Sequence, residues 1–125
     1  MFTICKRYPF EMAHKLKSSY SKECQQIHGH SYKLEVTIQS DKLNEDGMVM
    51  DFKKLNEIME PIIATYDHEY LDFDVCHYNP TAENMAKKIY YKICFGLIDL
   101  DSDPAIKLIK VRLWETEKAY VEYQT

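Results

Sequence analysis

The stretch HGHSYKLEVTIQS (residues 28–40) decides the fold class, because its side chains alternate between two kinds in the manner of a half-buried β-strand. Counted by twos, one side of this strand consists of His28, His30, Tyr32, Leu34, Val36 and Ile38. The other side is mostly polar. Both imidazoles therefore continue the row that faces the core. They are either core histidines that hydrogen-bond to the backbone or ligands that share one site.

Two further segments show the same alternation and also end in a polar group. Residues 2–14 end in His14, and Lys6 interrupts their apolar side, which predicts a β-bulge at that position. Residues 105–115 end in Glu115 and precede a partner strand at 118–124. The apolar side of residues 105–115 is predicted to consist of Ile109, Val111 and Leu113.

Between these strands the apolar spacing changes to that of amphipathic helices. One helix follows Asp51 as its N-cap, and Pro61 within it predicts a kink or an early end. The other opens in NPTAEN (residues 79–84), where Asn79 or Thr81 can act as the cap. The order ββααββ predicts one α+β domain over residues 1–125, in which two helices cover one face of an antiparallel four-stranded sheet.

Composition limits the functional classes. The 125 residues carry 16 Lys and Arg against 20 Asp and Glu, and this net charge of −4 argues against binding to nucleic acid or to an anionic membrane. No stretch is apolar enough to span a membrane or to serve as a secretion signal, so we expect a cytoplasmic protein. The cysteines, which show no CxxC spacing, are expected to be reduced: Cys5, Cys24, Cys76 and Cys94.

The three histidines that end apolar rows suggest a metal site. Neighbouring antiparallel strands lie about 4.8 Å apart, so His14 can meet His28 and His30 across a hairpin. Three imidazoles with a fourth position open to water or substrate are typical of catalytic zinc. The pattern therefore predicts one metal ion per chain. Zinc is the favoured metal, although imidazoles also bind iron, nickel or copper.

A cysteine and an Asp-His dipeptide are further candidates for catalytic groups beside this metal site. Cys24 lies four residues before His28, where its thiol could be a metal ligand, a base or a nucleophile. Asp67 and His68 are adjacent, and a carboxylate beside an imidazole can hold one tautomer and raise its basicity. Such a dipeptide is also common in ordinary surface loops.

Several segments, in order and spacing, resemble the 6-pyruvoyl-tetrahydropterin synthase superfamily. These segments are FEMAHKL, CQQIHGHSYKLEV, GMVMDFKKL, YDHEYLD, NPTAEN and WETEKAYVEY. The short spacing from Cys24 to the HGH motif is similar to the bacterial 6-carboxy-5,6,7,8-tetrahydropterin synthase branch, which serves queuosine biosynthesis. Glu69, where a second histidine often follows the dyad, and ETEKAY (residues 115–120) depart from that branch.

The resemblance implies a tunnelling-fold enzyme, a homohexamer in which each of two stacked trimers closes a β-barrel and active sites lie between subunits. It further implies a zinc-dependent lyase that converts 7,8-dihydroneopterin triphosphate to 6-carboxy-5,6,7,8-tetrahydropterin with release of acetaldehyde and triphosphate. Alternatives within the superfamily are a 6-pyruvoyl-tetrahydropterin synthase or a folate-pathway variant. Outside it, a zinc hydrolase would give no reason for the cysteine, and a non-catalytic pterin- or zinc-binding protein would tolerate its loss.

The resemblance also implies residue roles. Zinc would bind His14, His28 and His30, the Cys24 thiolate would remove a proton, and Asp67 would orient His68 beside it. Glu115 would bind the pterin edge, with a proton-relay role as an option. Thr81 would add a pterin contact, although helix capping explains it better. The lysines of HKLKSSYSK (residues 14–22) either hold the triphosphate or belong to an ordinary surface loop.

Overall fold

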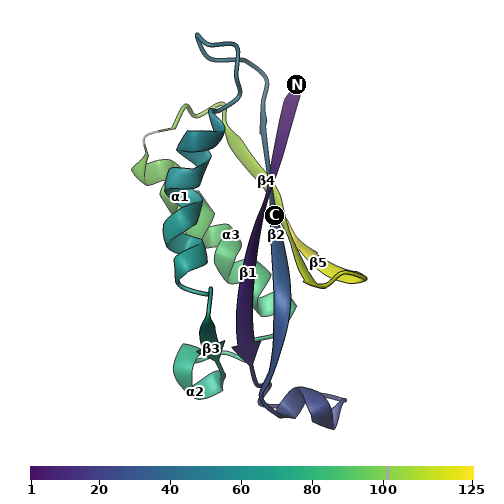
Figure 1. Ribbon diagram of the computed structural model, residues 1–125. Helices are drawn as coiled ribbons and strands as arrows, with labels where there is room; N and C mark the ends of the chain where they lie inside the picture. Colours follow the sequence, from purple (N-terminus) through teal and green to yellow (C-terminus); the bar gives the residue numbers. More distant parts are fainter. Residues whose placement is uncertain (101) are drawn as a thin grey trace.

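A computed structural model describes residues 1–100 and 102–125 of the chain. The elements are, in order, β1 (Phe2–His14), a 3₁₀ turn η1 (Lys22–Gln25), β2 (His28–Ser40), α1 (Phe52–Ala64), β3 (Glu69–Leu71), α2 (Phe73–Cys76), α3 (Ala82–Asp99), β4 (Lys107–Thr116) and β5 (Ala119–Tyr123). The strands form one five-stranded sheet in the order β3-β1-β2-β4-β5. Figure 1 shows α1 and α3 on the same side of this sheet. The α+β class and the two covering helices are therefore confirmed.

The sheet differs from the predicted four-stranded antiparallel one. The four long strands are antiparallel, but β3 adds a fifth strand that runs parallel to β1. The prediction was wrong because β3 has three residues, too few for alternation to reveal. The one-turn helix α2 was missed for the same reason, since its four residues show no helical period.

The β1–β2 register fixes the end of the sheet that matters most here. It runs without interruption from the Phe2–Ser40 pair to the His14–His28 pair. The predicted bulge at Lys6 is therefore wrong. The Lys6 side chain remains on the helix-facing side of β1, where its ammonium donates a 2.7 Å hydrogen bond to Oδ1 of Asn56 in α1. A long side chain can cover apolar surface in this way while its charge reaches a polar partner.

A bulge occurs instead between β2 and β4. Register shifts at Thr37 and Ile38, which pair with Lys110 and Leu108. The bulge changes which β4 side chains face the helices, so that Leu108 packs against the core in place of the predicted Ile109. Val111 and Leu113 are fully buried, as predicted.

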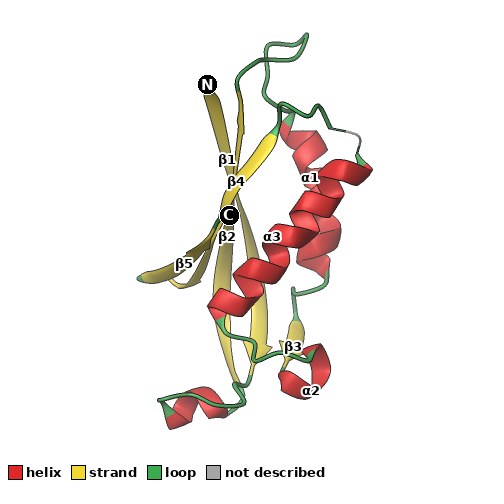
Figure 2. Cartoon of the chain, turned by 180° about the vertical axis from the view of Figure 1, so that it is seen from behind, coloured by secondary structure: helices red, strands yellow, loops and turns green. Residues whose placement is uncertain are grey.

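The helices begin where the sequence indicated. Asp51 accepts a hydrogen bond from the Lys53 N–H, and Thr81 accepts one from the Asn84 N–H, so both act as N-caps. Pro61 does not end α1, which continues to Ala64. Both long helices pack on the sheet, as Figure 2 shows from behind. Within the described residues, no helix is long and apolar enough to cross a membrane.

Candidate functional site

Three imidazoles meet at one end of the β1–β2 pair. His14 lies directly opposite His28, and His30 lies diagonally across on the same face. One ring nitrogen from each lies within 4.8 Å of the other two. The ring centroids are 4.5 Å apart for His14 and His28, 5.1 Å for His14 and His30, and 4.9 Å for His28 and His30. The structure thus brings together the three histidines predicted as metal ligands.

Backbone carbonyls orient two of these rings. His14 Nδ1 lies 2.8 Å from the carbonyl oxygen of Pro80, and His28 Nδ1 lies 2.8 Å from that of Gln26. Because a carbonyl can only accept, each Nδ1 carries the proton and each Nε2 keeps a free lone pair. Such outer hydrogen bonds fix the tautomer of metal-binding histidines.

Two of the ring nitrogens in this cluster have no hydrogen-bond partner in the protein. Across residues 1–100 and 102–125, the buried side-chain nitrogen and oxygen atoms without a hydrogen bond are His14 Nε2 and His30 Nε2. Burial lowers the pKa of both side chains below that of an ordinary histidine, which favours their neutral form at pH 7. Neutral, unpartnered imidazole nitrogens that converge on one point fit a transition-metal ion.

A carboxylate completes this end of the site. Glu115 Oε1 lies 3.5 Å from Nε2 of His14 and 3.5 Å from Nε2 of His30. The Glu115 oxygen and His14 Nε2 both accept hydrogen bonds, so a cation near them would remove their mutual repulsion.

The imidazoles open onto a cavity of about 470 Å³ between the sheet end, the loop after β1 and the start of α3. Its lining consists of His14, Leu16, Glu23, Cys24, His28, His30, Thr81, Ala82, Glu83 and Glu115. Cys24 comes from the 3₁₀ turn, which is tied to β1 by a 2.9 Å hydrogen bond from the Leu16 N–H to the Cys24 carbonyl. A half-buried thiol thus opens onto the same cavity as the three histidines.

Sequence reasoning gave no role to two carboxylates in this cavity, Glu23 of the 3₁₀ turn and Glu83. Glu83 lies in the first turn of α3 and lines the cavity beside Thr81. Acidic residues in the first turn of a helix usually serve the helix dipole, so the sequence gave no separate signal. The only clue was its place in NPTAEN, two residues after Thr81. The Thr81 hydroxyl lines the cavity as well, but it also accepts the capping hydrogen bond from Asn84.

Asp67 and His68 lie elsewhere. Their side chains pair at 3.0 Å between Asp67 Oδ1 and His68 Nδ1, yet neither lines the cavity described above. The pair follows α1 at the sheet edge where β3 begins, and the Glu11 N–H donates to Asp67 at 2.9 Å. This hydrogen bond is the main cause that lowers the pKa of Asp67. The His68 side chain is 79% exposed, so the chain by itself holds the pair together but apart from Cys24.

The lysines of the 14–22 segment have acidic neighbours. Lys15 and Lys17 line a second cavity of about 230 Å³ together with Asp72 and Asp74, and Leu16 lines both cavities. The Lys17 ammonium also lies 3.8 Å from the centroid of the Phe73 ring. Binding of a triphosphate by this segment therefore stays a prediction.

The chain thus combines a five-stranded α+β fold with three histidines, a cysteine and carboxylates around one cavity. Residues 3–125 match the family model described as 6-pyruvoyl tetrahydropterin synthase, and the chain belongs to that family. Among curated relatives, the 6-carboxy-5,6,7,8-tetrahydropterin synthase of Aquifex aeolicus is 31% identical, with 97% of this chain and 96% of that protein covered. The enzyme of the same name from Synechocystis is 38% identical over 74% of this chain and 75% of its own length.

Solved structures that resemble this chain include a member of the same family. The 6-pyruvoyl tetrahydropterin synthase of Caenorhabditis elegans superposes with a TM-score of 0.83 at 30% identity, covering 99% of this chain and 95% of that one. An uncharacterized protein from Wolinella succinogenes superposes with a TM-score of 0.80 at 19% identity, with 99% and 98% covered, which shows a shared fold. The family expected from the sequence motifs is therefore confirmed.

Proposed function

We propose that this chain is a zinc-dependent lyase that converts 7,8-dihydroneopterin triphosphate and water to 6-carboxy-5,6,7,8-tetrahydropterin, acetaldehyde and triphosphate in queuosine biosynthesis. The observation that carries the proposal is the shared cavity of the Cys24 thiol and three imidazoles with convergent ring nitrogens. The names of the curated relatives support the same product.

His14, His28 and His30 would hold the metal, since their ring nitrogens converge and two of them have no other partner. Zinc bound there would act as a Lewis acid toward the side-chain hydroxyls of the substrate and so make the adjacent C–H bond more acidic. Backbone carbonyls orient the rings of His14 and His28, so the geometric evidence for these two ligands is stronger than for His30. One zinc ion per chain is expected.

Cys24 is the proposed base. Its thiolate would take the proton from the substrate carbon beside the metal-bound hydroxyls and could return it to the pterin ring. The transfer is an internal redox step, so no nicotinamide or flavin is needed. Asp67 would hold His68 in the tautomer that assists this thiol, provided that the pair reaches the cavity.

Three carboxylates line the cavity, and two of them, Glu115 and Glu83, suggest different tasks. Glu115 lies against the imidazoles, which places it at the reacting end of a bound substrate and suits a proton relay. Glu83 is exposed at the start of α3, where it lines the same cavity and would accept hydrogen bonds from the amino-pyrimidine edge of a pterin. We therefore add Glu83 to Glu115 and Thr81 as proposed pterin contacts.

Assembly would complete the site. Because β3 pairs only with Met12–His14, the Phe2–Glu11 part of β1 forms one free edge of the sheet, and β5 forms the other. Such edges are stabilised when another chain pairs with them. We propose that three chains close a β-barrel through these edges and that two trimers form a hexamer. Asp67 and His68 of one subunit would then reach the cavity of a neighbour.

The product test is incubation of zinc-loaded protein with 7,8-dihydroneopterin triphosphate, followed by chromatography and mass spectrometry of the pterins. Carboxytetrahydropterin with an equal amount of acetaldehyde supports the proposal. Pyruvoyltetrahydropterin would assign the alternative synthase activity, and hydroxymethyl-dihydropterin would assign the folate-pathway variant. A dephosphorylated pterin alone would indicate a zinc hydrolase, and unchanged substrate would indicate a pterin- or zinc-binding protein without catalysis.

A further inference from the structure

Glu115 occupies an irregular position in β4. Pairing of β4 with β2 ends at Trp114, which lies opposite Lys33. On the other side, Trp114 pairs with Tyr120 and Thr116 pairs with Ala119, so Glu115 is the extra residue of a bulge. A bulge re-aims a side chain and leaves its residue outside the regular ladder. The direction of the Glu115 side chain therefore depends on what fixes its neighbours.

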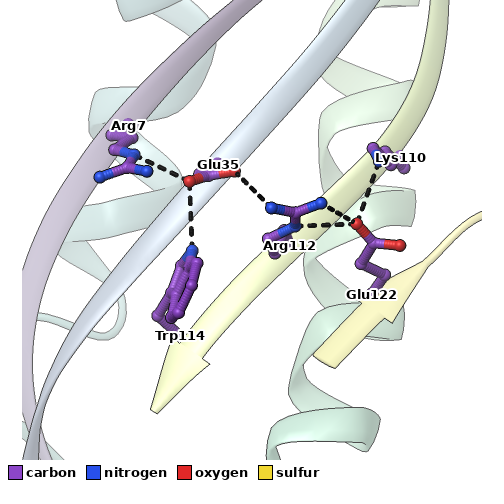
Figure 3. Close-up of polar contacts among 6 residues, drawn as sticks. All are labelled: Arg7, Glu35, Lys110, Arg112, Trp114 and Glu122. Carbon is purple, nitrogen blue, oxygen red and sulfur yellow. Dashed lines mark hydrogen bonds and ion pairs between the residues drawn. The ribbon is translucent and has the colours of Figure 1, made fainter. Parts of the chain in front are cut away.

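Trp114 is fixed on the face of the sheet away from the helices, which we call the open face. Its indole Nε1 donates a 3.1 Å hydrogen bond to Oε1 of Glu35 in β2, and its ring lies 4.6 Å from that of Tyr120. Figure 3 shows the indole pointing along the open face toward the Glu35 carboxylate. Trp114 and Glu115 are adjacent, so this anchor acts on the last regular residue before the bulge.

The anchor is itself held rigidly. The Glu35 side chain is only 9% exposed, and its Oε1 lies 2.8 Å from Nε of Arg7, its partner across β1. Its Oε2 lies 3.8 Å from Nη1 of Arg112, its partner across β4, and Arg112 binds Glu122 at 2.6 Å (Figure 3). A buried carboxylate with several donors has one favourable position. Because it is held from both sides, Glu35 gives the indole a fixed partner.

We propose that Trp114 is a positioning residue for Glu115 and that Glu35, on the same open face as Trp114, holds Trp114 in place. The inference rests on the proposed function in that it concerns the same metal and substrate cavity. The hydrogen bond across β2 and β4 keeps the bulge in one conformation, and the bulge directs the Glu115 carboxylate to the ring nitrogens of His14 and His30. Neither Trp114 nor Glu35 touches the cavity itself.

The test is a double-mutant cycle read out as zinc affinity, measured on the full chain by competition with a chelator. Trp114→Phe removes the N–H donor, and Glu115→Gln removes the directed charge. Each should weaken zinc binding by about tenfold, the lower end of the range for outer partners of a metal site. If Trp114 acts through Glu115, the double variant binds zinc no more weakly than Glu115→Gln alone. Additive losses, or an unchanged affinity in Trp114→Phe, would overturn the proposal.

A second set of variants separates positioning from a general loss of structure. Glu35→Ala removes the acceptor and should weaken zinc binding, whereas Glu35→Gln restores an acceptor oxygen and should recover most of the affinity. Glu57→Gln alters an exposed carboxylate on α1, outside this network, and should leave zinc affinity unchanged. Equal losses in Glu35→Ala and Glu35→Gln, or a loss in Glu57→Gln, would contradict positioning.

Zinc affinity requires no pterin, so the two proposals can fail separately. If the wild-type protein makes no carboxytetrahydropterin while the cycle is non-additive, the proposed function is wrong and the positioning role stands. If the wild-type protein is active while the Trp114→Phe and Glu115→Gln losses add, the positioning role is wrong and the function stands.

Discussion

His28 tests the metal site most directly at the scale of one residue, because it is one of three converging ligands and lies away from the deepest core. His28→Ala should bind far less than the one zinc per chain expected of the wild-type protein, because two imidazoles rarely hold the ion alone. Plasma emission analysis of dialysed protein measures the stoichiometry. His77→Asn is a matched control, since His77 adopts a left-handed conformation that Asn tolerates and lies outside the cluster. Full zinc content in His28→Ala would contradict the site.

Cys24 separates binding from chemistry. Cys24→Ala should keep zinc and pterin binding but lose turnover by about 10²–10⁴-fold, the usual contribution of a positioned base. Zinc content and kcat are measured on the same preparation. Near-normal turnover in the zinc-loaded variant would move the base to another residue, and loss of zinc would make the thiol a ligand instead.

Asp67 gives a pH dependence. The Glu11 N–H holds the pKa of Asp67 below its ordinary value, so the ionised side chain stabilises the folded chain at neutral pH. This contribution is lost as the pH falls below about 3.9, the ordinary Asp value, and through the folded pKa. Asp67→Asn should therefore lower Tm slightly at pH 7, and the difference from wild type should shrink in acid. Thermal unfolding at a series of pH values measures both, and a constant or widening difference would exclude this role.

At the scale of elements, one glycine lets α1 and α3 approach closely. A Cβ on Gly96 would lie 2.5 Å from Cγ2 of Ile58 in α1. Gly96→Ala should lower the free energy of unfolding by about 1–3 kcal/mol through overpacking, although Ala is the better helix former. In an Ile58→Ala background the same change should be neutral or stabilising by up to about 1 kcal/mol. Denaturant titration of the four proteins measures the coupling, and an equal cost in both backgrounds would exclude the contact.

Elements with a repeated pattern were predictable, and those without one were not. The alternation in β1 and β2 placed His14, His28 and His30 on one face, because side chains of a strand alternate strictly. Glu115 was expected beside them and lies there, but it belongs to a bulge that alternation did not predict. The three-residue β3 offered no period. Ile109 was misplaced because an alternating row does not reveal where pairing with the next strand slips. The bulge at Lys6 was wrong because a lysine can stay in an apolar row when its ammonium reaches a polar partner, here Asn56.

At the scale of the whole molecule, the position of Asp67 and His68 could not be predicted, because it depends on how α1 returns to the sheet edge. If the proposed assembly is correct, their partner is Cys24 of another subunit. Cys24→Ala and His68→Ala should each be inactive alone. Co-expression of the two should restore about a quarter of wild-type activity, because each site takes Cys24 from one subunit and His68 from another, and subunits mix at random. Activity assays of the purified mixture, with native mass spectrometry of the assembly, measure this. No recovery in mixed oligomers would place the whole site within one chain.

The pairing of His14 with His28 would give a metal ion bound as proposed a part in selecting the folded state. A slip of β1 against β2 by one residue would turn an entire row of side chains to the other face of the sheet. It would carry His14 away from the other two imidazoles at the same moment as it exposed the apolar row. An ion that needs all three rings binds only chains whose strands are aligned, so by mass action it enriches them over misaligned competitors. The three-histidine site would thereby favour correct alignment of β1 and β2 in addition to its part in the chemistry.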